Sequence, residues 1–98
     1  MPDCYFVIQT DGAGADAASA KDVKRVHADV KQCARDNAGS LKTFVHDKTQ
    51  KKVDTHIRYT TREEAEAALS SLVQCLEQKG NVVLDSGVAD TAEDLGLI

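Results

Sequence analysis

The stretch from residue 41 to residue 69, LKTFVHDKTQKKVDTHIRYTTREEAEAAL, holds two alternating segments followed directly by a helix start. Leu41–Asp47 and Val53–Thr60 alternate with a period of two residues, which predicts two strands. The polar residues 48–52 between them predict the loop of a hairpin. Thr61 and Glu64 have the spacing of a capping box, so a helix is expected to begin there.

The same alternation predicts the two faces of the hairpin. The face toward the core is expected to carry Leu41, Thr43, Val45, Val53, Thr55, Ile57 and Tyr59. The opposite face is expected to carry Lys42, Phe44, His46, Asp54, His56 and Arg58. This second face is polar enough to lie in water or against a partner.

A strand and a helix are predicted before the hairpin. Cys4–Thr10 is β-branched and aromatic, which is typical of a central strand. Residues 11–20 are rich in Gly, Ala and Asp and predict a flexible loop. Lys21–Asn37 has apolar residues at helical spacing, with Ser19 as the N-cap and Gly39 in the left-handed position after the last turn.

The segments after the hairpin complete the fold prediction. The second helix is expected to end at Gly80, before a short strand at Asn81–Asp85 and a C-terminal tail at residues 90–98. The resulting order predicts an α+β fold, a ferredoxin-like βαββαβ sandwich with a four-stranded antiparallel sheet and two helices on one face. All 98 residues are expected to form this one domain, because a chain of this length builds a single core.

Composition limits the classes of partner. Twelve Lys and Arg against sixteen Asp and Glu give a net charge of −4, so no broad positive field attracts nucleic acid. The apolar runs Tyr5–Ile8 and Val82–Leu84 are far too short to span a bilayer, and residues 1–4 lack the features of a signal peptide. We therefore expect a cytoplasmic protein that binds neither membranes nor, by its overall charge, nucleic acid.

Neither a metal nor a cofactor is predicted. Cys4, Cys33 and Cys75 are odd in number and widely spaced, which favours reduced thiols that pack in the core. The expected fold brings all three toward one end of the sandwich, so they are weak candidates for a metal site. Residues 12–17, GAGADA, have the spacing of a phosphate-binding loop, but neighbouring aspartates would repel phosphate.

The candidate site lies on the face of the sheet predicted to be open. Its predicted binding residues are Tyr5, Phe44, His46, Asp54, His56 and Arg58. Two histidines on neighbouring strands suit acid–base chemistry near neutrality. If the protein is an enzyme, the predicted catalytic residues are His46, His56 and Arg58.

Two functions without nucleic acid fit this pattern. The favoured one is a small non-catalytic protein-binding module, a regulator or stoichiometric inhibitor that acts through its sheet face or acidic helix surface. Its expected partners are a second copy of the chain, which would form a homodimer, a larger protein target, or both. It is favoured because several apolar side chains are expected on the open face: Tyr5, Val7, Phe44 and Val83. The alternative is a small enzyme of the dimeric α+β barrel type, with His46 and His56 as acid and base.

A third function follows from a resemblance. Val53–Leu69 resembles the third strand and second helix of an RNA-recognition motif, and Tyr5 lies where that family's first strand often carries a stacking aromatic residue. The resemblance implies single-stranded RNA binding through Tyr5, Phe44 and His56. Asp54 and His56 occupy the family's exposed stacking positions, and a carboxylate there repels the phosphodiester backbone.

Overall fold

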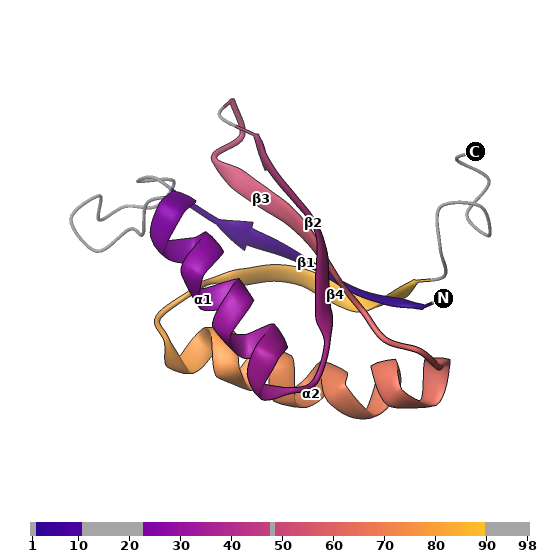
Figure 1. Cartoon of the computed structure of the whole chain (residues 1–98). Helices are drawn as coiled ribbons and strands as arrows, with labels where there is room; N and C mark the ends of the chain where they lie inside the picture. The colour runs from indigo at the N-terminus through magenta and orange to yellow at the C-terminus, as the bar shows by residue number, and fades with distance from the viewer. Residues whose placement is uncertain (1, 11–22, 48, 90–98) are drawn as a thin grey trace.

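Buried and more exposed residues alternate along the central strands, so that one face of the sheet can be buried against two amphipathic helices. The computed structural model describes residues 2–10, 23–47 and 49–89. Its elements are β1 (Asp3–Gln9), α1 (Val23–Asp36), β2 (Ser40–Asp47), β3 (Lys52–Arg58), α2 (Arg62–Gln78) and β4 (Val83–Ala89). The fold is α+β, with a four-stranded antiparallel sheet in the order β2-β3-β1-β4 and two helices (Figure 1).

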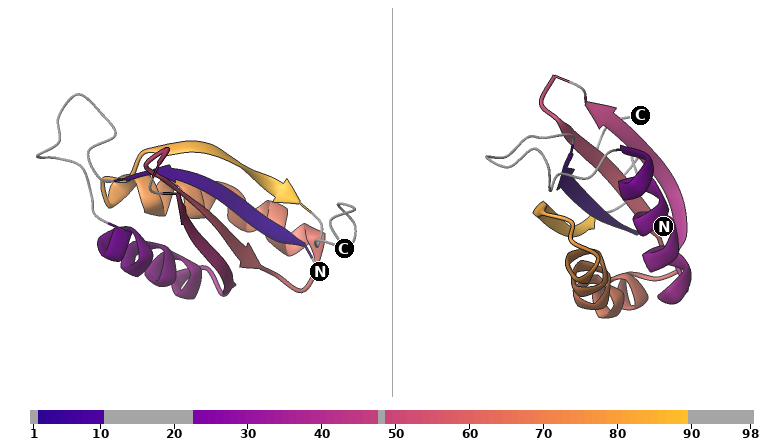
Figure 2. Two further views of the ribbon diagram at one scale, coloured as in Figure 1. Left: turned by 90° about the horizontal axis from the view of Figure 1, so that it is seen from above. Right: turned by 90° about the vertical axis from the view of Figure 1, so that its left-hand side faces the viewer.

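Both helices lie on the same side of the sheet, as the views in Figure 2 show. The core between these layers consists of buried side chains from the two central strands and from both helices: Cys4, Phe6, Ile8, Val53, Ile57, Val26, Val30, Cys33, Leu72 and Leu76. Successive side chains of a strand point to opposite faces. The strand side chains that point away from the helices therefore form a second face that neither helix covers, which we call the open face.

Most element boundaries agree with the sequence prediction to within two or three residues. The Thr61 hydroxyl accepts a hydrogen bond from the Glu64 amide at 3.1 Å, and Gly80 has a φ of 89°, so both predicted ends of α2 are confirmed. β4 extends four residues beyond the predicted strand because Ser86–Ala89 pair with the first half of β1. The predicted loop at 11–20, the Ser19 cap and the tail at 90–98 lie outside the described residues.

The end of α1 differs from the prediction. Ala38, with a φ of 58°, adopts the left-handed conformation that was expected of Gly39. Gly39 is needed for space instead, because a Cβ there would lie 2.5 Å from Ile57 Cγ2 and 2.8 Å from Tyr59 Cζ. The Tyr59 hydroxyl donates a hydrogen bond to the Asn37 carbonyl at 2.8 Å and so holds the turn against the end of β3.

Substitutions at these two neighbours should have opposite effects on stability. Ala38→Gly should raise the free energy of unfolding by about 1 kcal/mol, because a left-handed alanine is strained and glycine is not. Gly39→Ala should lower it by roughly 1–3 kcal/mol, because the added methyl group overlaps Ile57 and Tyr59. Urea denaturation of both variants tests this pair, and equal effects at the two positions would contradict it.

The predicted faces of β2 are wrong beyond Leu41. Leu41 pairs with Ile57, but Thr43 pairs with His56, so Lys42 is an extra residue that forms a β-bulge. The bulge reverses the alternation after Leu41. Phe44 and His46 therefore point toward the helices, and Thr43 and Val45 lie on the open face.

The prediction of reduced cysteines in the core is confirmed for Cys4 and wrong for Cys33 and Cys75. Cys33 of α1 and Cys75 of α2 form a disulfide with a Cα–Cα distance of 5.9 Å, which links the two helices across 42 residues of sequence. Cys4 remains a buried thiol whose Sγ donates to the Ala65 carbonyl at 3.2 Å in the first turn of α2, about 15 Å along that helix from Cys75. Burial, followed by the nearby charge of Asp3, raises the pKa of Cys4 to about 11.

Alkylation followed by mass spectrometry should distinguish the three cysteines. Without reductant, iodoacetamide should add nothing to the folded protein, because Cys4 is buried and protonated and the other two are bonded. Unfolding in denaturant should expose Cys4 alone, and unfolding with reductant should expose all three cysteines. Labelling of Cys33 or Cys75 in the denatured, unreduced protein would contradict the disulfide.

Neither helix in the described part of the chain combines the length and the apolar character needed to cross a membrane.

Candidate functional site

The strands place the side chains of the open face in rows that cross the sheet. This follows because residues paired directly across an antiparallel sheet point to the same face. The first row contains Ser40, Arg58, Asp3 and Ala89; the second contains Thr43, His56, Tyr5 and Gly87; the third contains Val45, Asp54, Val7 and Asp85.

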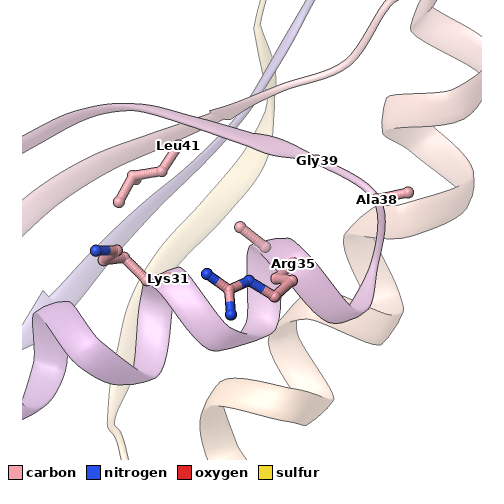
Figure 3. A pocket seen from close by; sticks show the side chains of 6 residues that line it. Lys31, Arg35, Ala38, Gly39 and Leu41 are labelled. Carbon is pink, nitrogen blue, oxygen red and sulfur yellow. The ribbon is translucent and has the colours of Figure 1, made fainter.

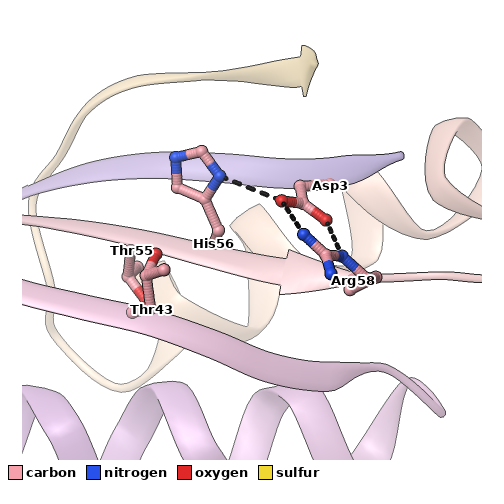
Figure 4. Close-up of polar contacts among 5 residues, drawn as sticks. All are labelled: Asp3, Thr43, Thr55, His56 and Arg58. Atoms are coloured by element: carbon pink, nitrogen blue, oxygen red, sulfur yellow. Dashed lines mark hydrogen bonds and ion pairs between the residues drawn. The ribbon is translucent and has the colours of Figure 1, made fainter. Parts of the chain in front are cut away.

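A polar cluster made of Asp3, Arg58 and His56 occupies the first two rows (Figure 4). The Asp3 carboxylate accepts hydrogen bonds from Arg58 Nε at 2.7 Å and Arg58 Nη2 at 3.2 Å, a bidentate pairing. His56 Nδ1 lies 3.2 Å from the second Asp3 oxygen. The Asp3 side chain is 5% exposed, while Arg58 and His56 are 30% and 32% exposed. A buried anion is thus covered by two partly exposed nitrogen donors.

The neighbours of Asp3 keep this buried carboxyl group ionised. Burial alone raises the pKa of Asp3, but the hydrogen bonds and charges of Arg58 and His56 outweigh burial and hold that pKa below its ordinary value. Because Asp3 is then a carboxylate with acceptors only, the proton of the contact belongs to His56 Nδ1. The cluster therefore sets which ring nitrogen of His56 donates to Asp3 and leaves Nε2 for other contacts.

Because Asp3 stabilises the fold only as a carboxylate, its protonation at low pH should lower the stability of the protein. A depressed pKa means that Asp3 stabilises the fold above its unfolded pKa of about 3.9 and loses this contribution as pH falls through the lower folded value. Asp3→Asn should therefore lower the free energy of unfolding by about 2 kcal/mol at pH 7, with the difference from wild type shrinking below about pH 4. Denaturation curves at several pH values measure this difference.

Asp54→Asn is the matched control, because Asp54 is an exposed aspartate on the same strand as Arg58. Its substitution should change stability little at any pH. An Asp3→Asn effect that stays constant down to acid pH would show that the carboxylate charge is not the stabilising element.

Tyr5 lies across the sheet rather than standing away from it. A Cβ on Gly87 would be 2.6 Å from the Tyr5 hydroxyl oxygen and 2.8 Å from its ring, so the ring covers the glycine of the neighbouring strand. On the other side, the Tyr5 ring is 6.4 Å from the His56 ring, tilted by 39°. Gly87 thus provides the space in which the Tyr5 ring lies over β4.

The structure separates the predicted site residues into two groups. Four of them, Tyr5, Asp54, His56 and Arg58, lie on the open face. The other two point toward the helices. Phe44 packs on His27 of α1 with ring centroids 4.6 Å apart, and His46 Nε2 lies 3.3 Å from the hydroxyl of buried Thr10. The acid–base pair predicted from His46 and His56 is therefore not assembled on one face.

The predicted apolar character of the open face also changes. Phe44 faces the helices, and so does Val83, which pairs with the buried Ile8. Val45 replaces them on the open face and is 60% exposed. The large apolar side chains in the three rows of this face are thus Tyr5, Val7 and Val45, without the Phe44 and Val83 that the sequence predicted there.

Sequence reasoning missed Asp3. It directly precedes the predicted strand and was not assigned to the site. The period-two spacing from Tyr5 was the available signal, because it places Asp3 on the same face as Tyr5. The pairing with Arg58 depends on strand register, which the spacing does not give.

The described residues contain no group of three or more side chains that could hold a metal ion. The weak metal candidates are divided between a disulfide and a separate thiol. No protein-family model and no curated protein matches the sequence of this chain.

Proposed function

We propose that this protein is a non-catalytic protein-binding module, a regulator or inhibitor, that forms a homodimer through its open face. The observation that carries the proposal is the arrangement of Tyr5, His56 and Arg58 on the face that neither α1 nor α2 covers. Gly87 provides the space for Tyr5, and Asp3 holds His56 and Arg58, before any partner arrives.

Such prior ordering favours binding. Tyrosine and arginine dominate the energetics of many interfaces, and side chains that are already fixed lose little conformational entropy on association. Val7 and Val45 add apolar area in the next row. The open face thus combines anchors, apolar area and a neutralised charge cluster, which is the composition of an interface centre.

A second copy of the chain can pack its open face on this one by a two-fold rotation. Consider a two-fold axis that runs along the rows, between the row of Tyr5 and the row of Val7. It would set His56 of each copy opposite Asp54 of the other, and Tyr5 opposite Val7. The pairing of Tyr5 with Val7 buries apolar surface, while Arg58 would face Lys52 of the other copy near the edge of the contact.

Light scattering during size exclusion tests the dimer directly. The wild-type protein should elute with the mass of a dimer, and Val45→Lys should elute as a monomer. Val45 is 60% exposed, so the new lysine costs the monomer little but buries a charge in the interface.

Ala67→Lys is the matched control, since Ala67 is exposed on α2 away from the sheet. It should remain dimeric. A wild-type protein that stays monomeric up to millimolar concentration would overturn the proposal. A Val45→Lys variant that stays dimeric would remove the open face as the interface.

One observation favours enzymatic function as a second candidate. The Asp3 contact orients His56 with Nε2 available, an arrangement that suits a general base. This candidate retains His56 and Arg58 of the predicted catalytic set, while His46 faces the helices.

Binding of RNA has less support, because Asp54 and Asp85 are exposed on the open face and would repel phosphate.

We also propose that the fold is ferredoxin-like. β1 and β2 both run antiparallel to β3 between them, and β3 and β4 both run antiparallel to β1 between them. Two interleaved βαβ units of this kind support the ferredoxin-like topology.

The cytoplasmic location stays a prediction, and the Cys33–Cys75 disulfide weighs against it because such bonds persist mainly in oxidising compartments.

A further inference from the structure

A groove on the helix side of the molecule lies between the second half of α1 and the start of β2 (Figure 3). Its volume is about 430 Å³, and it is lined by Lys31, Ala34, Arg35, Ala38, Gly39 and Leu41. It shares no residue with the three rows described above and is independent of the proposed dimer.

The two walls of this α1–β2 groove differ in chemistry. Lys31 and Arg35 extend from α1 along one wall, and the Leu41 side chain extends from β2 on the other. Buried Ala34 adds a small apolar surface at the helix. The groove thus has a cationic wall and an apolar wall that face each other.

The cations of this groove have no acidic partner among the described residues. No lining residue is acidic, and neither Lys31 nor Arg35 makes a hydrogen bond or ion pair within the part of the chain that the structure describes. Asp36, which follows Arg35 in the chain, accepts a hydrogen bond from Gln32 at 2.8 Å. Within the described residues, the positive charge along this wall is therefore not neutralised by an acidic side chain.

The spacing of these charges suits an extended peptide. Lys31 and Arg35 are one helical turn apart, about 6 Å along α1. Side chains two residues apart on an extended chain point to the same side and lie about 6.6 Å apart, while the residue between them points to the opposite side. An acidic–apolar–acidic segment would therefore direct two carboxylates to the cationic wall and its central side chain to Leu41.

We infer that the α1–β2 groove binds an extended acidic peptide segment of another protein, in which an apolar residue is flanked by two acidic ones. Lys31 and Arg35 bind the two carboxylates, and Leu41 with Ala34 binds the apolar side chain. The groove is a second binding surface of the module, on the side opposite its open face.

A capped peptide, Gly-Glu-Leu-Glu-Gly, is a direct probe of this groove. Titrated into the ¹⁵N-labelled protein, it should shift the amide resonances of residues 31–41 and leave those of the open face unchanged. The isosteric peptide with both Glu replaced by Gln should bind roughly tenfold more weakly, because two partly exposed ion pairs are lost. A permuted peptide, Gly-Glu-Glu-Leu-Gly, should also bind more weakly, since its charges are adjacent.

Protein variants test the same contacts from the other side. Lys31→Gln with Arg35→Gln should weaken binding of the parent peptide by roughly the same tenfold factor. Lys51→Gln with Lys79→Gln removes the same charge from exposed positions elsewhere and should leave binding unchanged. Arg35 also lies in the last turn of α1, where a cation stabilises the helix, so the variants are compared after thermal unfolding shows that they are folded.

The outcomes separate specific binding from general attraction of anions. Equal affinities for the parent and permuted peptides, or resonance shifts spread over the whole protein, would overturn the inference. So would a parent peptide that causes no shift at low salt. These peptide comparisons use the wild-type protein and do not depend on the folding of any variant.

Discussion

The extra residue in β2, Lys42, decides which side chains of that strand lie on each face of the sheet. Without this bulge, Phe44 would lie on the open face and Val45 would point toward the helices. With it, the larger aromatic side chain packs on His27 under the helix layer, and the smaller valine lies in solvent. Burial of an aromatic ring removes more apolar surface from water than burial of valine, so the bulge increases the apolar surface that the core buries.

The open face that results is organised by charge more than by apolar surface. Asp3 is the central group, because it is buried on the face that neither α1 nor α2 covers and is neutralised by two donors from β3. A carboxylate in this position is stable only while both donors stay in place. The cluster therefore ties β1 to β3 and also fixes the side chains that we propose a partner would meet.

The two proposed surfaces differ in the way they would recognise a partner. The open face offers fixed side chains in rows, which suits a flat surface such as another copy of the same sheet. The α1–β2 groove offers a cationic and an apolar wall at the spacing of an extended chain. Because the surfaces lie on opposite sides of the sheet, occupation of one leaves the other open.

The sequence by itself determined the elements of this protein and their order. Local signals specify them: the Thr61 cap, the left-handed Gly80 and the period-two strands are each encoded within a few neighbouring residues. The period-two spacing also placed four site residues on the open face, because β1 and β3 pair without a bulge: Tyr5, Asp54, His56 and Arg58.

Tertiary structure decided the rest. The direction of Phe44 and His46, the pairing of Asp3 with Arg58 and the disulfide between Cys33 and Cys75 all depend on register and on helix packing. These are contacts between residues distant in sequence, and no local pattern of side chains encodes them.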